Sequence, residues 1–125
     1  MPALPITSLT AAIAAVALIV LSFLVSFRRM KVDINIGTGD DVALLKRIRA
    51  QGNFIEYVPI TLILLALVEM AGAGTGQLWT ISGLLLGGRL LHAVGMLGGV
   101  LPARGLGMLM TYAAMLMAIA LLPLS

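Results

Sequence analysis

The sequence predicts an all-α membrane protein, a bundle of four transmembrane helices. Of its 125 residues, 61% are hydrophobic and 10% are charged, and the apolar residues fall into four runs of about 20 residues, the length that spans a bilayer. A soluble domain usually carries about a quarter charged residues, and a disordered chain is poor in apolar ones. Both classes are therefore excluded. We expect one integral membrane domain, 1–125, with spans at 5–27, 50–71, 77–97 and 105–123.

The first apolar run is predicted to remain in the membrane as an anchor. It has no ionisable residue between Ile6 and Phe27, and Arg28 and Arg29 come directly after it. A cleaved signal peptide would instead have basic residues ahead of a shorter apolar stretch.

The connection after this run carries most of the positive charge. Six of the eight Lys and Arg residues lie within 22 positions: Arg28, Arg29, Lys31, Lys46, Arg47 and Arg49. Because cytoplasmic loops are enriched in Lys and Arg, we expect this connection and the third one, with Arg104, to be cytoplasmic, and both termini to lie on the other side. The basic pI of about 10.0 then reflects topology, and we expect no nucleic-acid partner.

The second run is predicted to be the end of a longer helix. Glycines at 37 and 39 indicate a turn, and Asp40 is the expected N-cap. A helix from Asp41 to Ala71 would be about 45 Å long at 1.5 Å per residue, so its first turns should stand out of the bilayer. Pro59 lies inside it and should bend its axis.

The third and fourth runs carry fewer signals. The third run holds the small residues Ser82, Gly83, Gly87, Gly88 and Gly95, with Gly83 and Gly87 in a G-x-x-x-G spacing. Together they predict close helix packing. Trp79 is expected to anchor at the membrane interface, and Glu69 should be interfacial as well. Tyr112 lies in the fourth run, and the sequence identifies no partner for it.

Polar residues inside the second run share one helical face. Arg49, Asn53 and Glu56 are spaced i, i+4 and i+7, with Tyr57 beside them. Gln51 points nearly opposite to Arg49, toward a different helix or another subunit. Because polar groups inside a membrane are costly, each is a candidate functional residue.

The third run has a matching face of Arg89, His92 and Met96. At 1.5 Å per residue, Glu56 and Arg89 lie ~9 and ~13 Å from the cytoplasmic ends of their helices, which predicts an ion pair between them. The groups could simply neutralise one another between helices. Alternatively, the surplus arginines could bind a small carboxylate ligand or lipid head groups. With one histidine and no cysteine, no metal site is expected.

These residues together resemble the MAPEG family, the membrane-associated proteins in eicosanoid and glutathione metabolism. The likeness covers nearly the whole chain: four spans, a basic first loop, and the motif R-A-Q-G-N-F-I-E-Y-V-P at residues 49–59. The segments G-R-L-L-H at 88–92 and L-P-A-R at 101–104 are similar to the microsomal glutathione transferase branch. The small bacterial form looks closest, which implies the bacterial inner membrane and a role in detoxification.

The resemblance implies a homotrimer that binds glutathione as co-substrate between neighbouring subunits, near the cytosolic face. Carried over residue by residue, Arg49, Asn53, Glu56 and Tyr57 would bind glutathione, and Arg28 and Gln51 would reach in from the adjacent chain. Arg89 and His92, at a similar depth, complete this set. Arg104 would stabilise the thiolate, and Arg29 would be an auxiliary basic residue. The physics agrees, because a cation near a helix N-terminus favours a thiolate over a thiol.

Three hypotheses about function remain at this point. The first is a glutathione transferase or peroxidase that acts on lipophilic electrophiles from the bilayer. The second is a non-catalytic family member, because Met96 and His92 replace aromatic residues found in some eukaryotic members. The third is a small proton-coupled exporter that uses Glu56, although the first span carries no charge.

Overall fold

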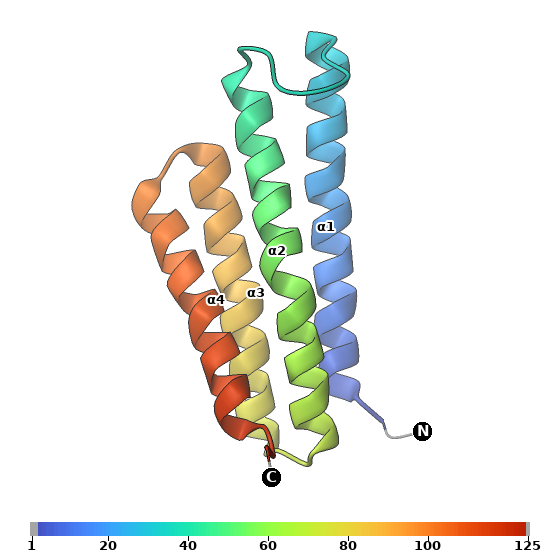
Figure 1. Cartoon of the computed structure of the whole chain (residues 1–125), viewed down its shortest axis with the longest axis vertical. Helices are drawn as coiled ribbons and strands as arrows, with labels where there is room; N and C mark the ends of the chain where they lie inside the picture. Colours follow the sequence, from blue (N-terminus) through green and yellow to red (C-terminus); the bar gives the residue numbers. More distant parts are fainter. Residues whose placement is uncertain (1–2, 125) are drawn as a thin grey trace.

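The computed structural model describes residues 3–124 as an up-and-down bundle of four helices. The helices are α1 (Pro5–Val32), α2 (Val42–Met70), α3 (Thr75–Gly98) and α4 (Leu101–Leu121). All four are long and apolar enough to cross a membrane. Both termini lie at one end of the bundle, and the α1–α2 connection lies at the other (Figure 1). The helical fold class is therefore confirmed.

The four helices differ in how many others they contact and in how far they extend. α2 and α3 each contact the other three helices, whereas α1 and α4 make no contact with each other within residues 3–124. In Figure 1, α1 and α2 extend beyond the α3–α4 connection, so one end of the bundle is stepped. The long second helix was predicted correctly: α2 has 29 residues, or about 43 Å, and Pro59 lies inside it.

The start of α2 differs from the prediction by one residue. Asp41, not Asp40, is the N-cap, and its carboxylate accepts a hydrogen bond from the Leu44 backbone N–H at 2.8 Å. The same carboxylate pairs with Arg28 at the end of α1 at 2.9 Å. The hydrogen bond from Arg28 is the main reason that the pKa of Asp41 is lowered from its ordinary value of 3.8. One side chain thus starts α2 and ties it to α1.

The opposite end of the α1–α2 pair is joined by Glu69. Its carboxylate accepts hydrogen bonds from the backbone N–H groups of Ile6 and Thr7 at 3.0 and 2.8 Å, and from the Thr7 hydroxyl at 2.8 Å. The first N–H groups of a helix have no partner inside it, and they favour an anion. Glu69 therefore caps α1 from the end of α2.

α3 and α4 form the tightest pair, and only some of the predicted glycines lie at their contact. A Cβ atom at Gly83 would meet nothing within 4 Å, and one at Gly87 would meet only the end of the Met110 side chain. A Cβ at Gly88 would instead lie 2.8 Å from the Gly107 carbonyl oxygen, and Gly95 is equally crowded by the Arg104 backbone. The predicted close packing is therefore confirmed at Gly88 and Gly95, whereas Gly83, one member of the G-x-x-x-G pair, meets no other helix of this bundle.

Candidate functional site

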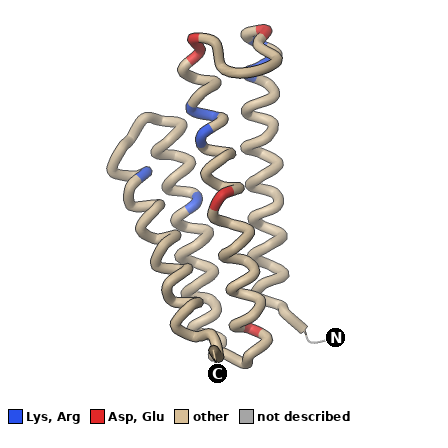
Figure 2. Tube along the Cα trace, in the orientation of Figure 1, with Lys and Arg blue, Asp and Glu red and all other residues tan. Residues whose placement is uncertain are grey.

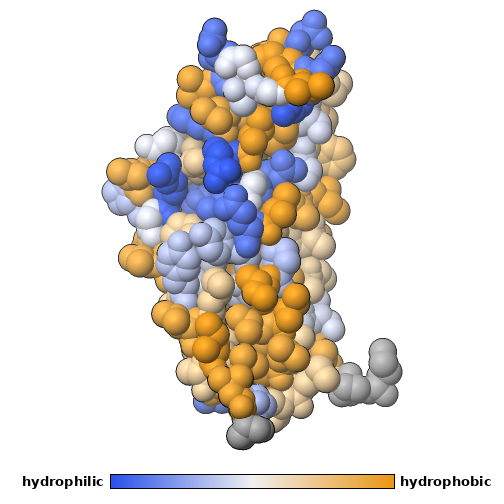
Figure 3. Space-filling view, viewed as in Figure 1, coloured by the Kyte–Doolittle hydropathy of each residue, from blue (hydrophilic) through white to orange (hydrophobic). Residues whose placement is uncertain are grey.

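Charged residues gather toward one end of the molecule. Figure 2 shows Lys and Arg in the half of the bundle nearest the α1–α2 connection. In Figure 3 a hydrophilic area crosses this half of the visible face, and the other half is largely hydrophobic. Charge inside a membrane protein normally lines a cavity or a pairing network, so this half is where a site is expected.

A pocket of about 340 Å³ lies in this half, between α2, α3 and α4. Each helix contributes residues that repeat every four positions, which places them on one face of that helix. The lining residues are Arg49, Asn53 and Tyr57 from α2, His92 and Met96 from α3, and Arg104, Met108 and Tyr112 from α4. We call this the α2–α4 pocket. It brings together five residues that the sequence analysis assigned to the site: Arg49, Asn53, Tyr57, His92 and Arg104.

Two guanidinium groups give this pocket its charge. Arg49 pairs with Glu56 at 3.6 Å, and both side chains are about half exposed, at 48% and 51%. Arg104 is the fourth residue of α4, and it donates a weak hydrogen bond to the Met96 sulfur at 3.6 Å. Within residues 3–124, the ion pairs found join Arg28 to Asp41 and Arg49 to Glu56. Arg104 therefore lines the pocket without a carboxylate partner in the described chain.

The predicted ion pair between Glu56 and Arg89 is wrong. Arg89 is 5% exposed and donates to the Asn53 side-chain oxygen at 2.6 Å, while Glu56 pairs with Arg49. The depth argument was insufficient because it left out competing partners on the same face of α2: Arg49 pairs with Glu56, and Asn53 accepts from Arg89. Glu56 is seven residues after Arg49, nearly two full turns, and so returns to the same side of α2.

Arg89 is instead held by neutral groups behind the pocket. Its guanidinium lies 3.4 Å from the His92 Nδ1 atom, 3.5 Å from the Thr111 hydroxyl and 5.8 Å from the centre of the Phe54 ring. Its Nε atom is buried without a hydrogen-bond partner in the described residues. Arg89 therefore fixes Asn53 and His92, two residues that line the pocket.

The other predicted ligand residues lie outside this pocket, on the side of α1. Arg28 donates from Nε and Nη2 to Asp41, and Arg29 donates to the backbone oxygens of Ile34 and Gly37. The Gln51 amide donates to the Ser22 hydroxyl at 2.9 Å, so Gln51 faces a different helix from Arg49, as predicted. Their assigned role, at the pocket of a neighbouring subunit, remains a prediction.

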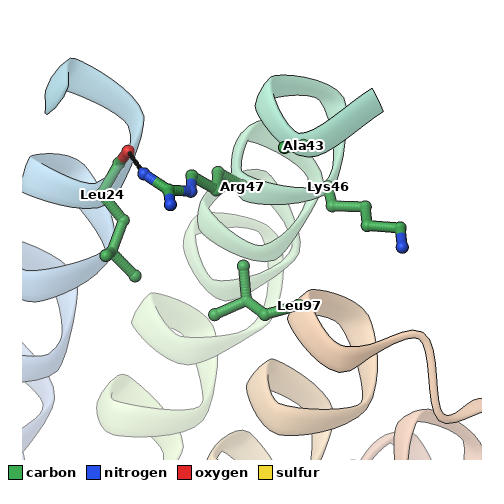
Figure 4. A pocket seen from close by; sticks show the side chains of 5 residues that line it. All are labelled: Leu24, Ala43, Lys46, Arg47 and Leu97. Atoms are coloured by element: carbon green, nitrogen blue, oxygen red, sulfur yellow. Dashed lines mark hydrogen bonds between the residues drawn. The ribbon is translucent and has the colours of Figure 1, made fainter. Parts of the chain in front are cut away.

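A second groove continues from the α2–α4 pocket toward the stepped end of the bundle. It has a volume of about 460 Å³, shares Arg49, Met96 and Arg104 with the pocket, and adds Lys46. Figure 4 shows Lys46 and Arg47 leaving α2 in opposite directions. Arg47 donates to the Leu24 carbonyl oxygen of α1 at 2.7 Å, so Lys46 adds a third cation on the α3–α4 side.

Tyr112 is the residue in the pocket that the sequence analysis left without a role. Its hydroxyl lies 3.2 Å from the Tyr57 hydroxyl, and the two rings meet edge to face with their centres 5.6 Å apart. The spacing of Arg104, Met108 and Tyr112 was a usable signal, because it repeats the four-residue spacing of the second-helix residues. The sequence analysis read that spacing only on the second and third helices.

Comparison with known proteins gives the family. The MAPEG family profile matches residues 7–123. Two curated relatives, both named inner membrane protein YecN and from two strains of Escherichia coli, are each 35% identical over 112 residues, which covers 90% of this chain and 86% of theirs. No solved structure matches at a comparable level. Four apolar helices and these relatives support an integral inner-membrane protein. The chain therefore belongs to the MAPEG family.

Proposed function

We propose that this protein is a membrane-bound, glutathione-dependent transferase or peroxidase that acts on lipophilic electrophiles. The observation that carries this proposal is the α2–α4 pocket, where Arg49 and Arg104 line a cavity together with Asn53, Tyr57 and His92. Apart from His92, these are residues that the family resemblance assigns to glutathione and its thiolate, and the set comes together from three helices.

The donor set suits a small peptide that carries carboxylates and an ammonium group. Arg49 can bind a carboxylate through paired N–H donors, and Glu56, 3.6 Å away, can accept from an ammonium. Asn53 is held by Arg89 at 2.6 Å, so its amide is already oriented before a ligand arrives. A pre-oriented site loses less conformational entropy on binding.

Arg104 is suited to activate a thiol. Its guanidinium comes from the first turns of α4, where the helix N-terminus carries partial positive charge. Both effects favour the thiolate, which is the reactive nucleophile. In the transferase reaction, the thiolate electron pair forms a bond to the electrophilic carbon, and the leaving group departs with the electron pair of the broken bond.

The proposed assembly is a homotrimer in which a neighbour completes each site. Within one chain, Arg28 binds Asp41 at the start of α2, and Gln51 binds Ser22 of α1. Both contacts are away from the α2–α4 pocket, so these residues can reach such a pocket only on another subunit. A mass measurement of the detergent-solubilised protein tests this. A monomer that still binds glutathione would exclude the shared site.

The function is tested with purified protein in lipid vesicles, using glutathione and a chloronitrobenzene. We expect conjugation by the wild-type protein and a loss of about 100-fold in Arg104→Ala, the usual effect of removing one preorganised charge-stabilising donor. Lys31→Ala is the matched control, because Lys31 is an exposed basic residue in the last turn of α1. An unchanged rate in Arg104→Ala would exclude the role given to Arg104.

A second candidate is a family member that binds glutathione without turnover. It is favoured by the contact between Arg104 and the Met96 sulfur, because a thioether cannot donate a hydrogen bond to a thiolate. Glutathione at about 100 times its Kd should raise stability by about 2.7 kcal/mol in either case. Stabilisation without conjugation would select this second candidate. The exporter hypothesis gains nothing from the geometry, because Glu56 is paired with Arg49.

A further inference from the structure

A long apolar groove between α1 and α3 has no part in the proposed glutathione chemistry. Its volume is about 580 Å³, larger than that of the α2–α4 pocket. The lining residues of α1 fall between Ile13 and Leu24, and those of α3 between Leu86 and Leu97. Apart from Arg89, whose guanidinium is held by Asn53, every lining residue is apolar. We call this the α1–α3 groove.

The length of this groove matches one leaflet of a bilayer. In the up-and-down bundle, α1 and α3 run in the same direction. Leu24 and Leu97 therefore lie toward the basic α1–α2 connection, and Ile13 and Leu86 lie toward the middle of the bundle. At 1.5 Å per residue, each lining stretch is about 16 Å long. The hydrocarbon core of a bilayer is about 30 Å thick, so the groove spans about half of it.

The groove is closed at the end farthest from the basic connection. Thr10 of α1 and Ser82 of α3 are buried, and their hydroxyl oxygens are 2.6 Å apart. They lie about one helical turn before Ile13 and Leu86, so the two helices touch directly where the groove ends. A chain that enters at the open end can therefore run as far as this contact and no farther.

A cation stands at the open end. A smaller pocket of about 280 Å³ shares Leu24 and Leu97 with the groove and adds Arg47. Figure 4 shows Arg47 reaching from α2 toward α1, above the side chains of both leucines. Its Nη1 atom donates to the Leu24 carbonyl oxygen at 2.7 Å. Within residues 3–124, Arg47 has no other hydrogen bond and no ion pair, so its remaining N–H donors are available to an anion.

We propose that the α1–α3 groove binds an anionic phospholipid, with one acyl chain between α1 and α3 and its phosphate on Arg47. The apolar walls suit the chain, and a guanidinium suits the phosphate because it can donate two parallel N–H bonds. Basic groups between helices at this surface attract anionic head groups. This site is independent of the proposed function, because no residue assigned to glutathione contacts the head group.

The groove also lies away from the contact that the proposed trimer would use. Gln51 binds Ser22 within one chain and is proposed to serve a neighbouring subunit. With 3.6 residues per turn, Ser22 lies on the opposite side of α1 from Ile13 and Leu24. A lipid can therefore occupy the groove while a neighbour approaches at Gln51.

The head-group part of the proposal is tested by native mass spectrometry of the detergent-solubilised protein. Phosphatidylglycerol and phosphatidylcholine with identical acyl chains are titrated separately. The wild-type protein should bind phosphatidylglycerol at least about fivefold more tightly, the effect of one nearby cation. Arg47→Gln keeps a donor for the Leu24 carbonyl and removes the charge, so it should lose this preference. Lys31→Gln is the matched control, because Lys31 is an exposed basic residue in the last turn of α1.

Three results would overturn the role of Arg47. They are a wild-type protein that does not distinguish the two lipids, an Arg47→Gln variant that still distinguishes them, and an equal loss in Lys31→Gln. The last result would assign the preference to the net charge of the loop.

The acyl-chain part is tested by filling the groove. Ala93 lines it, so Ala93→Phe should lose the tightly bound phosphatidylglycerol. Ala113→Phe is the control, since Ala113 is exposed on α4, a helix that does not line the groove. Unchanged lipid binding in Ala93→Phe would overturn the proposal. A changed number of subunits without loss of lipid would also overturn it, because the groove would then be a contact between copies of the chain.

A measurement on the wild-type protein keeps the test open if a variant does not fold. Phosphatidylglycerol with a photoreactive diazirine in its acyl chain is cross-linked to the protein, and the adducts are mapped. Val20 lines the groove and is 52% exposed, whereas its neighbour Ile19 lies outside it and is 54% exposed. Adducts at Val20 should be suppressed by excess phosphatidylglycerol and not by phosphatidylcholine, and adducts at Ile19 should not distinguish the two lipids. The same response at both residues would overturn the proposal.

Discussion

The carboxylate of Glu69, at the end of α2, lies 2.8 Å from the Thr7 backbone N–H at the start of α1. One residue thereby closes the α1–α2 pair at the end opposite to the Arg28–Asp41 ion pair. Each end of the pair is thus joined by a carboxylate that occupies a helix N-terminus.

Removing the Glu69 carboxylate should destabilise the bundle. Glu69→Ala leaves the N–H groups of Ile6 and Thr7 without their acceptor, and losing a helix cap costs about 0.5–2 kcal/mol. Thermal unfolding in detergent measures this loss. Glu69→Gln keeps one acceptor oxygen and should lose less. If the alanine variant unfolds at the wild-type temperature, the cap contributes nothing.

The Arg28–Asp41 pair should make stability depend on acid pH. The Arg28 guanidinium lowers the pKa of Asp41 from 3.8 in the folded chain. The folded state therefore binds this proton less readily than the unfolded state, and the stabilisation is present above about pH 3.8 and lost as the pH falls further. Asp41→Asn keeps the cap acceptor and removes the charge. The stability difference between the two proteins should shrink at acid pH, and a constant difference would contradict the ion-pair explanation.

Glycine substitutions should separate the real helix contact from the apparent one. In Gly88→Ala the new Cβ meets the Gly107 carbonyl oxygen at 2.8 Å, so α3 and α4 must move apart, at a cost of about 1–3 kcal/mol. In Gly83→Ala nothing lies within 4 Å, and the higher helix propensity of alanine should be neutral or favourable. Unfolding curves of the two variants measure this. Equal destabilisation would suggest that Gly83 faces another subunit.

Removing the Asn53 amide should cost more than removing a surface residue. Asn53→Leu leaves the buried Arg89 guanidinium without the 2.6 Å acceptor, and hydrogen bonds to charged groups are worth about 1.5–3 kcal/mol. Asn53→Asp restores an acceptor and supplies a counter-charge, so it should recover the stability measured by thermal unfolding. Failure of aspartate to recover any stability would mean that Asn53 acts through packing.

The positions of the helices could be predicted from hydropathy along the sequence, whereas the errors concerned which residues contact one another between helices. Hydropathy alone located four helices, because a span is a property of composition and length. It could not determine which side of a helix meets a neighbour, so it did not separate Gly88 from Gly83, and depth alone gave Arg89 the partner Glu56 in place of Asn53. Asp40 and Asp41 are adjacent candidates for a cap, and the contact with Arg28 distinguishes them.

The candidate site was anticipated best where polar residues repeat along a single helix. Arg49, Asn53 and Tyr57 do line one pocket. Tyr112 was missed because its partner, Tyr57, is 55 residues away in the sequence. The four-residue spacing from Arg104 to Tyr112 places Tyr112 on the site face of its helix, but the contact with Tyr57 becomes visible only when the helices are assembled.

The stepped end of the bundle affects how a water-soluble molecule and a lipid-soluble molecule could reach the same pocket. Because α1 and α2 extend beyond the α3–α4 connection, the groove with Lys46, Arg49 and Arg104 opens above the shorter hairpin, in the part of the molecule nearest the basic loop. Leu109 of α4 is exposed and lies three residues before Tyr112, which lines the α2–α4 pocket. A water-soluble thiol could therefore enter from the aqueous side through the groove, and a lipid-soluble electrophile could enter from the bilayer along α4. The thiol would not have to cross lipid, and the electrophile would not have to cross water.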